Sequence, residues 1–143
     1  MYGALDISVS GMVAQRTRLE TIAANIANAD AILDPNGDPN AFRRRIAILM
    51  PGDPTAKSAA GRANGVHISQ ILLDQSDFKK KYEPDSPYAQ PEGSPDAGYV
   101  YYPNIDPATE QVSAMEAMRA YEANVVAAEA TKTITAQALR MIA

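Results

Sequence analysis

The stretch that governs the fold of this 143-residue chain is residues 107–142, PATEQVSAMEAMRAYEANVVAAEATKTITAQALRMI. Apolar or small residues recur in it at alternating steps of four and three, which is the spacing of a seam between packed helices. Asp106 can cap the helix, Pro107 suits its first position, and Glu110 favours the positive end of the helix dipole. The sequence therefore predicts one long helix over about 107–142. Its stripe consists of Ala114, Met118, Tyr121, Val125, Ala128, Lys132, Thr135, Leu139 and Ile142.

The other end of the chain carries the same spacing and predicts a helix over about 4–28. Its stripe consists of Leu5, Val9, Met12, Arg16, Leu19, Ala23 and Ile26. All ten prolines fall between the two stripes. We therefore expect a mainly α fold, in which the terminal helices of 1–30 and 107–143 pack as an antiparallel coiled-coil-like pair around a Pro-rich insertion, 31–106, that contains a small β region. A register with Leu5 near Ile142 would bring Arg16 close to Glu129.

The insertion shows strand and turn signals. Alternation over 42–50 and β-branched residues over 66–73 predict two strands, and 76–82 and 99–102 can add more. The segment 34–39, DPNGDP, has the composition of a turn. It lacks the alternating ligands and terminal glutamate of a calcium loop. Residues 61–65, GRANG, read as a hairpin turn, and His67 is expected to face solvent on its strand.

The predicted seam is thin. Alanine buries little area at about 25 cal/mol per Å², and several stripe positions hold alanine or a charge. Joining the two ends also closes a loop of roughly 80 residues, which costs on the order of 4 kcal/mol. We therefore expect a marginally ordered subunit that gains apolar partners from neighbouring subunits in a polymer.

Composition excludes several classes of protein. The net charge is −4 and there are no cysteines. A nucleic-acid surface, a disulfide framework and thiolate metal sites are therefore not expected. The N-terminus lacks a cationic start followed by an apolar block, so a conventional secretory precursor is not expected. The basic runs 43–45 and 79–81 are interpreted mainly as solvated strand faces, or else as docking points for an acidic neighbouring subunit.

No catalytic, cofactor-binding or metal-binding motif is recognisable in the sequence. It contains no G-x-S-x-G, P-loop, H-E-x-x-H or dinucleotide fingerprint. Glu116, Glu122 and Glu129 do not share one helix face, so they favour solubility or pairing between subunits. We predict no enzyme, no cofactor and no small-molecule substrate. A coiled-coil adaptor and a secreted hydrolase with an unrecognised site are the competing hypotheses.

Asn25 and Asn28 lie three residues apart near the end of the first helix, hence on neighbouring surface. One interpretation is a fraying helix end with amide caps. The other is that the small alanines around them allow another helix to approach, while the asparagines bond to its backbone. Both interpretations can hold together.

Five short motifs, in this order, resemble those of flagellar basal-body rod proteins. They are ANIANAD at 24–30, YEP at 82–84, GYV at 98–100, PNID at 103–106 and YEANV at 121–125. Each is weak alone, but the ordered series spans nearly the whole chain. Many axial proteins follow the Asn-x-x-Asn stretch with a Thr-Pro-Gly-Tyr-like turn. Here AILDP follows at 31–35, which favours the branch of the family found in the proximal rod.

The resemblance implies a structural subunit of the bacterial flagellar rod, the torque-transmitting drive shaft that crosses the periplasm and encloses the export channel. Implied partners are other copies of the chain, other rod proteins, the protein that joins the rod to the membrane ring, and the flagellar type III export apparatus, through which it passes unfolded. No nucleic acid is implied. In related axial proteins the terminal helices form the inner tube.

We expect subunit contacts along both terminal helices. A polar substitution at Leu19, Ile26, Met118 or Val125 is predicted to abolish motility by preventing assembly while export continues. The candidate interface residues are Leu5, Val9, Met12, Leu19, Ile22, Asn25, Ile26, Asn28, Ala114, Met118, Tyr121, Asn124, Val125, Leu139 and Ile142.

Overall fold

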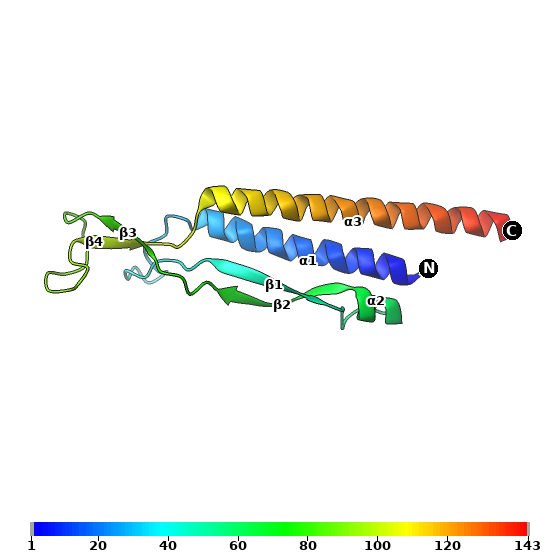
Figure 1. Ribbon diagram of the computed structural model, residues 1–143, viewed down its shortest axis with the longest axis horizontal. Helices are drawn as coiled ribbons and strands as arrows, with labels where there is room; N and C mark the ends of the chain where they lie inside the picture. Colours follow the sequence, from blue (N-terminus) through cyan, green and yellow to red (C-terminus); the bar gives the residue numbers. More distant parts are fainter. Residues whose placement is uncertain (1, 143) are drawn as a thin grey trace.

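Two long helices and two β-hairpins form an elongated molecule (Figure 1). The computed structural model describes residues 2–142, with side chains from 3 to 141. Helix α1 covers Tyr2–Ala27 and α3 covers Pro107–Ile142. Between them lie β1 (Arg45–Pro51), α2 (Ala59–Asn64), β2 (Val66–Leu73), β3 (Lys79–Tyr82) and β4 (Tyr99–Tyr102). The expected mainly α fold with a small β insertion is confirmed.

Helix α1 is the middle of three layers. It packs antiparallel to α3 on one side and against the β1–β2 hairpin and α2 on the other (Figure 1). Hairpin β3–β4 lies beyond the junction where α1 ends and α3 begins, and both chain termini lie at the opposite end. The small buried core therefore centres on α1 and on this junction, where Val100, Pro103 and Ile105 are nearly inaccessible to solvent.

The long α3 begins as its sequence predicts. Asp106 Oδ2 accepts a hydrogen bond from the Thr109 hydroxyl at 2.6 Å, and Asp106 Oδ1 accepts one from the Ala108 N–H at 3.4 Å. These bonds lower the pKa of Asp106, chiefly through the Thr109 hydroxyl. The ionised aspartate is thus a capping group at the start of the helix.

The β1–β2 hairpin pairs antiparallel from Arg45 opposite Leu73 to Pro51 opposite Val66, with a bulge between Ile48 and Leu49. The second predicted strand, 66–73, is confirmed at both ends, and the first begins three residues later than predicted. Hairpin β3–β4 pairs Lys79 with Tyr102 and Tyr82 with Tyr99, which confirms the two shorter predictions.

Two predictions for the first hairpin were wrong. The segment 61–65 is not a tight turn, because it mostly belongs to α2, whose N-cap Ser58 accepts a hydrogen bond from the Gly61 N–H at 3.0 Å. His67 does not face solvent. It is half-buried, with Nδ1 2.6 Å from the carbonyl oxygen of Gly52. The connection turns at Gly52 itself, whose φ of +81° suits glycine.

The turn predicted at 34–39 is confirmed. Asp34 Oδ1 accepts from the N–H groups of Asn36 and Asp38 at 2.8 and 3.1 Å, and Gly37 adopts a positive φ of +88°. The carboxylate therefore closes the turn through backbone donors, as aspartate does in such loops.

Candidate functional site: the faces of the terminal helices

The contact between α1 and α3 is made close by small side chains. A Cβ placed on Gly11 would lie 2.6 to 2.8 Å from the side-chain atoms of Asn124. Ala14, Ala117 and Ala128 are buried at 1%, 0% and 7% exposure. Each of these small residues removes little area from water, so its own contribution to the helix contact is small.

This close contact also fixes the register, and the predicted register was wrong. Gly11 lies opposite Asn124, and Arg18 Nη2 lies 3.5 Å from Glu116 Oε2. Counted along both helices from Gly11 and Asn124, Arg16 and Glu129 lie almost three turns apart, about 15 Å at 1.5 Å per residue. Arg16 instead pairs with Glu20 of its own helix at 3.2 Å. The same register sets Leu5 opposite the region of residue 130.

Most of the large apolar residues on the predicted stripes lie at the surface of the subunit. Val9 is 48% exposed, Met118 51% and Leu139 62%. Ile26 and Tyr121 are also exposed, at 37% and 36%. Both helices therefore leave several large apolar residues uncovered, while Gly11, Ala14, Ala117 and Ala128 are buried.

The other candidate interface residues are buried or half-buried, apart from one whose side chain is not described. Ile22 and Asn25 are buried inside the subunit, so their burial needs no neighbour. The side chain of Ile142 lies outside the described residues. The half-buried ones are Leu5, Met12, Leu19, Asn28, Ala114, Asn124 and Val125.

A buried polar cluster joins α1, β1 and α3. The Asn25 side chain exchanges two hydrogen bonds with the backbone of Arg45: Nδ2 donates to the carbonyl, and Oδ1 accepts from the N–H, both at 2.8 Å. Asn25 Nδ2 also donates to Glu110 Oε2 at 3.0 Å, and Arg44 Nε donates to Glu110 Oε1 at 2.6 Å. Because Glu110 is 1% exposed, its charge is balanced inside the chain by Arg44.

This cluster answers the two interpretations of the asparagines. Asn25 does bond to backbone, as the second interpretation held, but the backbone belongs to a strand and not to a helix. Asn28 donates to Ala24 of its own helix at 2.8 Å, as the first held. Sequence reasoning missed the burial of Glu110. Glu110, Ala117 and Asn124 are spaced by seven residues, and this spacing would have placed Glu110 on the inward face of α3.

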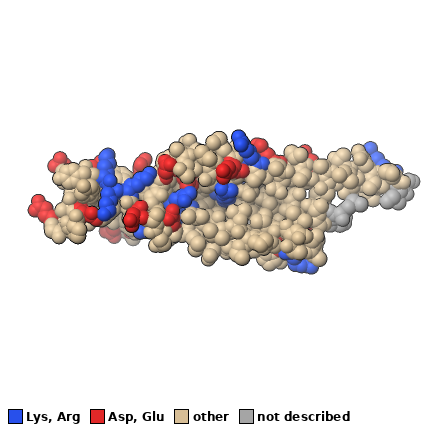
Figure 2. Space-filling view, viewed as in Figure 1, with Lys and Arg blue, Asp and Glu red and all other residues tan. Residues whose placement is uncertain are grey.

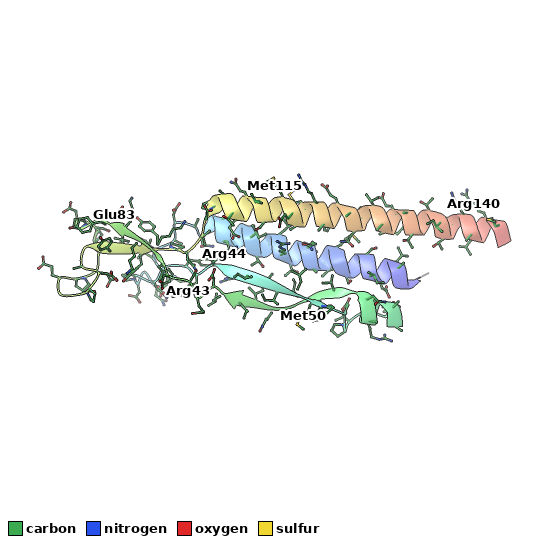
Figure 3. All side chains as sticks on the ribbon, in the orientation of Figure 1. Arg43, Arg44, Met50, Glu83, Met115 and Arg140 are labelled. Carbon is green, nitrogen blue, oxygen red and sulfur yellow. The ribbon has the colours of Figure 1, made fainter. Side chains whose placement is uncertain are left out.

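The interpretation of the basic runs as solvated faces was wrong for Arg44 and Arg43 (Figure 3). Arg44 also lies 3.6 Å from Asp74, whose pKa is lowered, chiefly by the backbone N–H of Ser76. Arg43 donates to the carbonyl of Asp74 at 3.1 Å and stacks over the Phe78 ring at 4.2 Å. Both arginines therefore bind within the subunit.

The three lysines of β3 are exposed, and each has a partner in its own chain. Lys79 donates to the Ile105 carbonyl at 2.5 Å, Lys80 pairs with Asp96 at 2.8 Å, and Lys81 pairs with Glu83 at 2.5 Å. Acidic and basic residues gather at this end of the molecule, whereas the end with the chain termini is largely without charge (Figure 2). The half with the chain termini still holds some charged residues, among them Asp6, Asp53 and Lys57.

An open groove runs between α1 and the β1–β2 hairpin in that half. Its volume is about 800 Å³, and its walls include Val9, Val13 and Thr17 of α1 and Val66 and Ile71 of β2. Val13 is 57% exposed and Ile71 49%. The groove is thus a mainly apolar surface that the chain leaves unfilled.

Helix α3 extends past the start of α1 (Figure 1). Gly11 lies opposite Asn124, and the two helices run antiparallel. Nine residues before Gly11, α1 begins at Tyr2, and the residue opposite Tyr2 is therefore Thr133 of α3, nine residues after Asn124. Residues 134–142, here called the overhang, therefore have no α1 residue beside them. Nine residues of helix span about 13 Å.

The described part of the chain offers little for chemistry. Among residues 2–142, no group of three or more His, Cys, Asp or Glu side chains is placed to hold a metal ion. Within the same range, no helix combines the length and the apolar character needed to cross a membrane.

Comparison with known proteins gives a consistent result. Residues 5–31 match a family described as flagella basal body rod protein, and residues 96–141 match one described as flagellar basal body rod FlgEFG protein C-terminal. Three similar proteins carry the name flagellar basal-body rod protein FlgC. The one from Bacillus subtilis is 36% identical over 98% of this chain and 97% of its own. Those from Escherichia coli O6:H1 and Aquifex aeolicus are 34% and 35% identical over 95% and 94% of this chain and 93% and 91% of their own.

Proposed function

This chain belongs to the FlgC family of flagellar basal-body rod proteins and is a structural subunit of the rod, and we propose that it polymerises through the outer faces of α1 and α3. The observation that carries the proposal is the exposure of large apolar side chains on two helices whose mutual contact uses small ones. Val9, Ile26, Met118 and Leu139 are all more than one third exposed. Apolar surface of this extent on a soluble chain is typical of a protein interface.

The proposed site of action is the proximal part of the rod, within the periplasm, where the subunits form a torque-transmitting shaft around an export channel. Partners are other copies, other rod proteins and the protein that joins the rod to the membrane ring. Many weak contacts acting together resist slip better than one strong contact, and a helical array gives each subunit several neighbours.

We further propose that the chain is exported unfolded through the flagellar type III apparatus. A small-residue contact between α1 and α3 and a small core support this, because they give a fold that opens at low cost. The absence of cysteine from the sequence also means that no disulfide has to be reduced before passage.

The test uses a strain that lacks this protein and receives variants of it. Met118→Asp is expected to abolish swimming and to remove the protein from purified basal bodies, while the protein still leaves the cytoplasm. The side chain of Met118 is 51% exposed, so the isolated variant should keep the helical circular dichroism and urea midpoint of the wild type. The matched control is Met118→Leu, which preserves the apolar surface and should swim.

Two outcomes would count against the proposed assembly. Normal swimming in a Met118→Asp or Val125→Asp strain would show that these faces are not interfaces. Wild-type protein found only in the soluble cytoplasm, and never in basal bodies, would instead favour a coiled-coil adaptor.

A further inference from the structure

The overhang continues the face by which α3 covers α1. Asn124 and Ala128 lie on that face beside α1, and the spacing of three and four residues carries it on through Thr135 to Leu139. Leu139 is 62% exposed because α1 has already ended there. One continuous helix face is thus covered over most of its length and bare at its end.

We propose that the overhang of one copy fills the groove between α1 and the β1–β2 hairpin of a second copy. This inference rests on the proposed polymerisation and specifies one of its contacts. An amphipathic helix laid in an apolar groove is a recurring mode of recognition, with anchors three or four residues apart. Thr135, Ala138 and Leu139 supply those anchors, and Val9 and Val13 line the wall that receives them.

Charge favours the same pairing. Residues 130–142 contain Lys132 and Arg140 and no acidic residue. The groove is lined by Asp6 and Asp53, with Lys57 and His67 also among its residues. Hydrogen bonds from the hydroxyl and N–H of Ser58 lower the pKa of Asp6, so this carboxylate is ionised at neutral pH.

Asp53 has the same property, because hydrogen bonds from the hydroxyl and N–H of Thr55 lower its pKa. Among the described residues neither carboxylate forms an ion pair within 4 Å, although Lys57 lies near enough to Asp6 to help lower its pKa. Arg44 and Lys80 already have such partners. A basic segment from another copy can therefore approach this groove without displacing an existing ion pair.

The overhang and the groove are different surfaces, so their pairing has no twofold symmetry. Contacts of this kind generate rings or open helical filaments and do not stop at a dimer. The register also sets the stagger between the two copies. Asn124 lies opposite the middle of the groove. The middle of the overhang lies about 14 residues further along α3, which corresponds to about 20 Å of helix. Adjacent copies are therefore offset by about 20 Å along the helix axis.

The test is disulfide crosslinking in purified basal bodies. Because the chain has no cysteine of its own, only the introduced cysteines of this chain can form crosslinks between its copies. A double variant with Val13→Cys and Leu139→Cys is expected to form a ladder of dimers and larger products on mild oxidation. The matched control pairs Val13→Cys with Ile134→Cys. Ile134 is 64% exposed, like Leu139 at 62%, but lies about 140° around the helix. It should give at least tenfold less product.

A second measurement covers the case in which the double variants do not swim. A photoreactive benzoylphenylalanine at position 13 alone, followed by trypsin digestion, should attach to the peptide 133–140, which lies between the cleavage sites at Lys132 and Arg140. Attachment to another protein, or to another part of this chain, would overturn the inference.

The remaining results separate this contact from the proposed function. Equal crosslinking by the Ile134 control would show that the wrong helix face was assigned. No crosslinking by either pair, in basal bodies that contain the protein, would remove the overhang contact and leave the rod assignment standing. Absence of the wild-type protein from basal bodies would remove both.

Discussion

Arg44, the residue before β1, and Glu110, on the first turn of α3, meet at 2.6 Å, and this ion pair fixes the start of the hairpin to the junction of the two long helices. The two residues are far apart in sequence, and Glu110 is 1% exposed. A buried carboxylate in this position is stable only while a cation accompanies it. A substitution that removes the cation at the junction should therefore destabilise the subunit strongly.

Arg44→Ala is expected to lower the free energy of unfolding by about 3–5 kcal/mol, because it leaves the buried Glu110 carboxylate without its cation. Urea unfolding of the purified chain would measure the effect. Arg18→Ala is the matched control. The two arginine side chains are exposed to a similar extent, 28% and 29%, but the partner of Arg18 is Glu116, which is 64% exposed. Its loss should be below about 1 kcal/mol. Equal losses would contradict the importance given to burial of the partner.

Asn25→Ala is expected to cost about 2–3 kcal/mol, because it removes a buried side chain that makes two part-buried hydrogen bonds to the backbone of Arg45. Asn28→Ala serves as the comparison, since Asn28 bonds only to Ala24 of its own helix. It should change stability by no more than about 0.5 kcal/mol. Thermal unfolding followed by circular dichroism can rank the two variants, and a similar loss in both would mean that the Asn25 bonds contribute little.

Gly11→Ala is expected to destabilise the chain by about 1–3 kcal/mol, even though alanine is the better helix former. The new Cβ would meet the Asn124 side chain at 2.6 Å, and Asn124 is held by a hydrogen bond to Ala120 at 2.8 Å. The double variant Gly11→Ala, Asn124→Ala should recover much of the loss because it removes the collision. If the double variant were as unstable as the sum of the single ones, the two positions would not be in contact.

Acid is expected to destabilise the start of α3. The pKa of Asp106 is lowered in the folded chain, chiefly by the Thr109 hydroxyl, so ionised Asp106 contributes stability above its unfolded pKa of about 4. That contribution is lost as the pH falls below this value through the folded pKa. Asp106→Asn keeps a capping side chain but cannot titrate here. Its urea midpoint should therefore fall less than that of the wild type between pH 7 and pH 3, and parallel curves would refute this assignment.

Both terminal helices and the second strand could be predicted from local sequence. The Asp-Pro start of α3, the absence of proline from the two helical stripes and the β-branched run at 66–73 each act over a few residues. Such signals depend on the chain's own backbone preferences and on the periodicity of side chains. They required no knowledge of which segments pack together.

The helix register and the polar cluster could not be predicted in the same way. The register depends on Gly11 and on alanines such as Ala117, whose small side chains give weak periodic signals, whereas larger residues such as Met118 suggested a different face. The pairing of Asn25, Arg44 and Glu110 joins three distant segments. One sequence does not say which of several arginines meets which carboxylate. Which apolar residues stay exposed depends on what the rest of the folded subunit covers, and local sequence does not specify that.

The unequal lengths of α1 and α3 give the subunit a direction. One of its ends is closed by the β3–β4 hairpin, and the other ends in a single unaccompanied helix. When copies are added in the same orientation, the growing tip and the base of the stack expose different surfaces. If copies stack as proposed, elongation and anchoring would need different partner proteins, and a subunit in the opposite orientation would find no matching surface at either end.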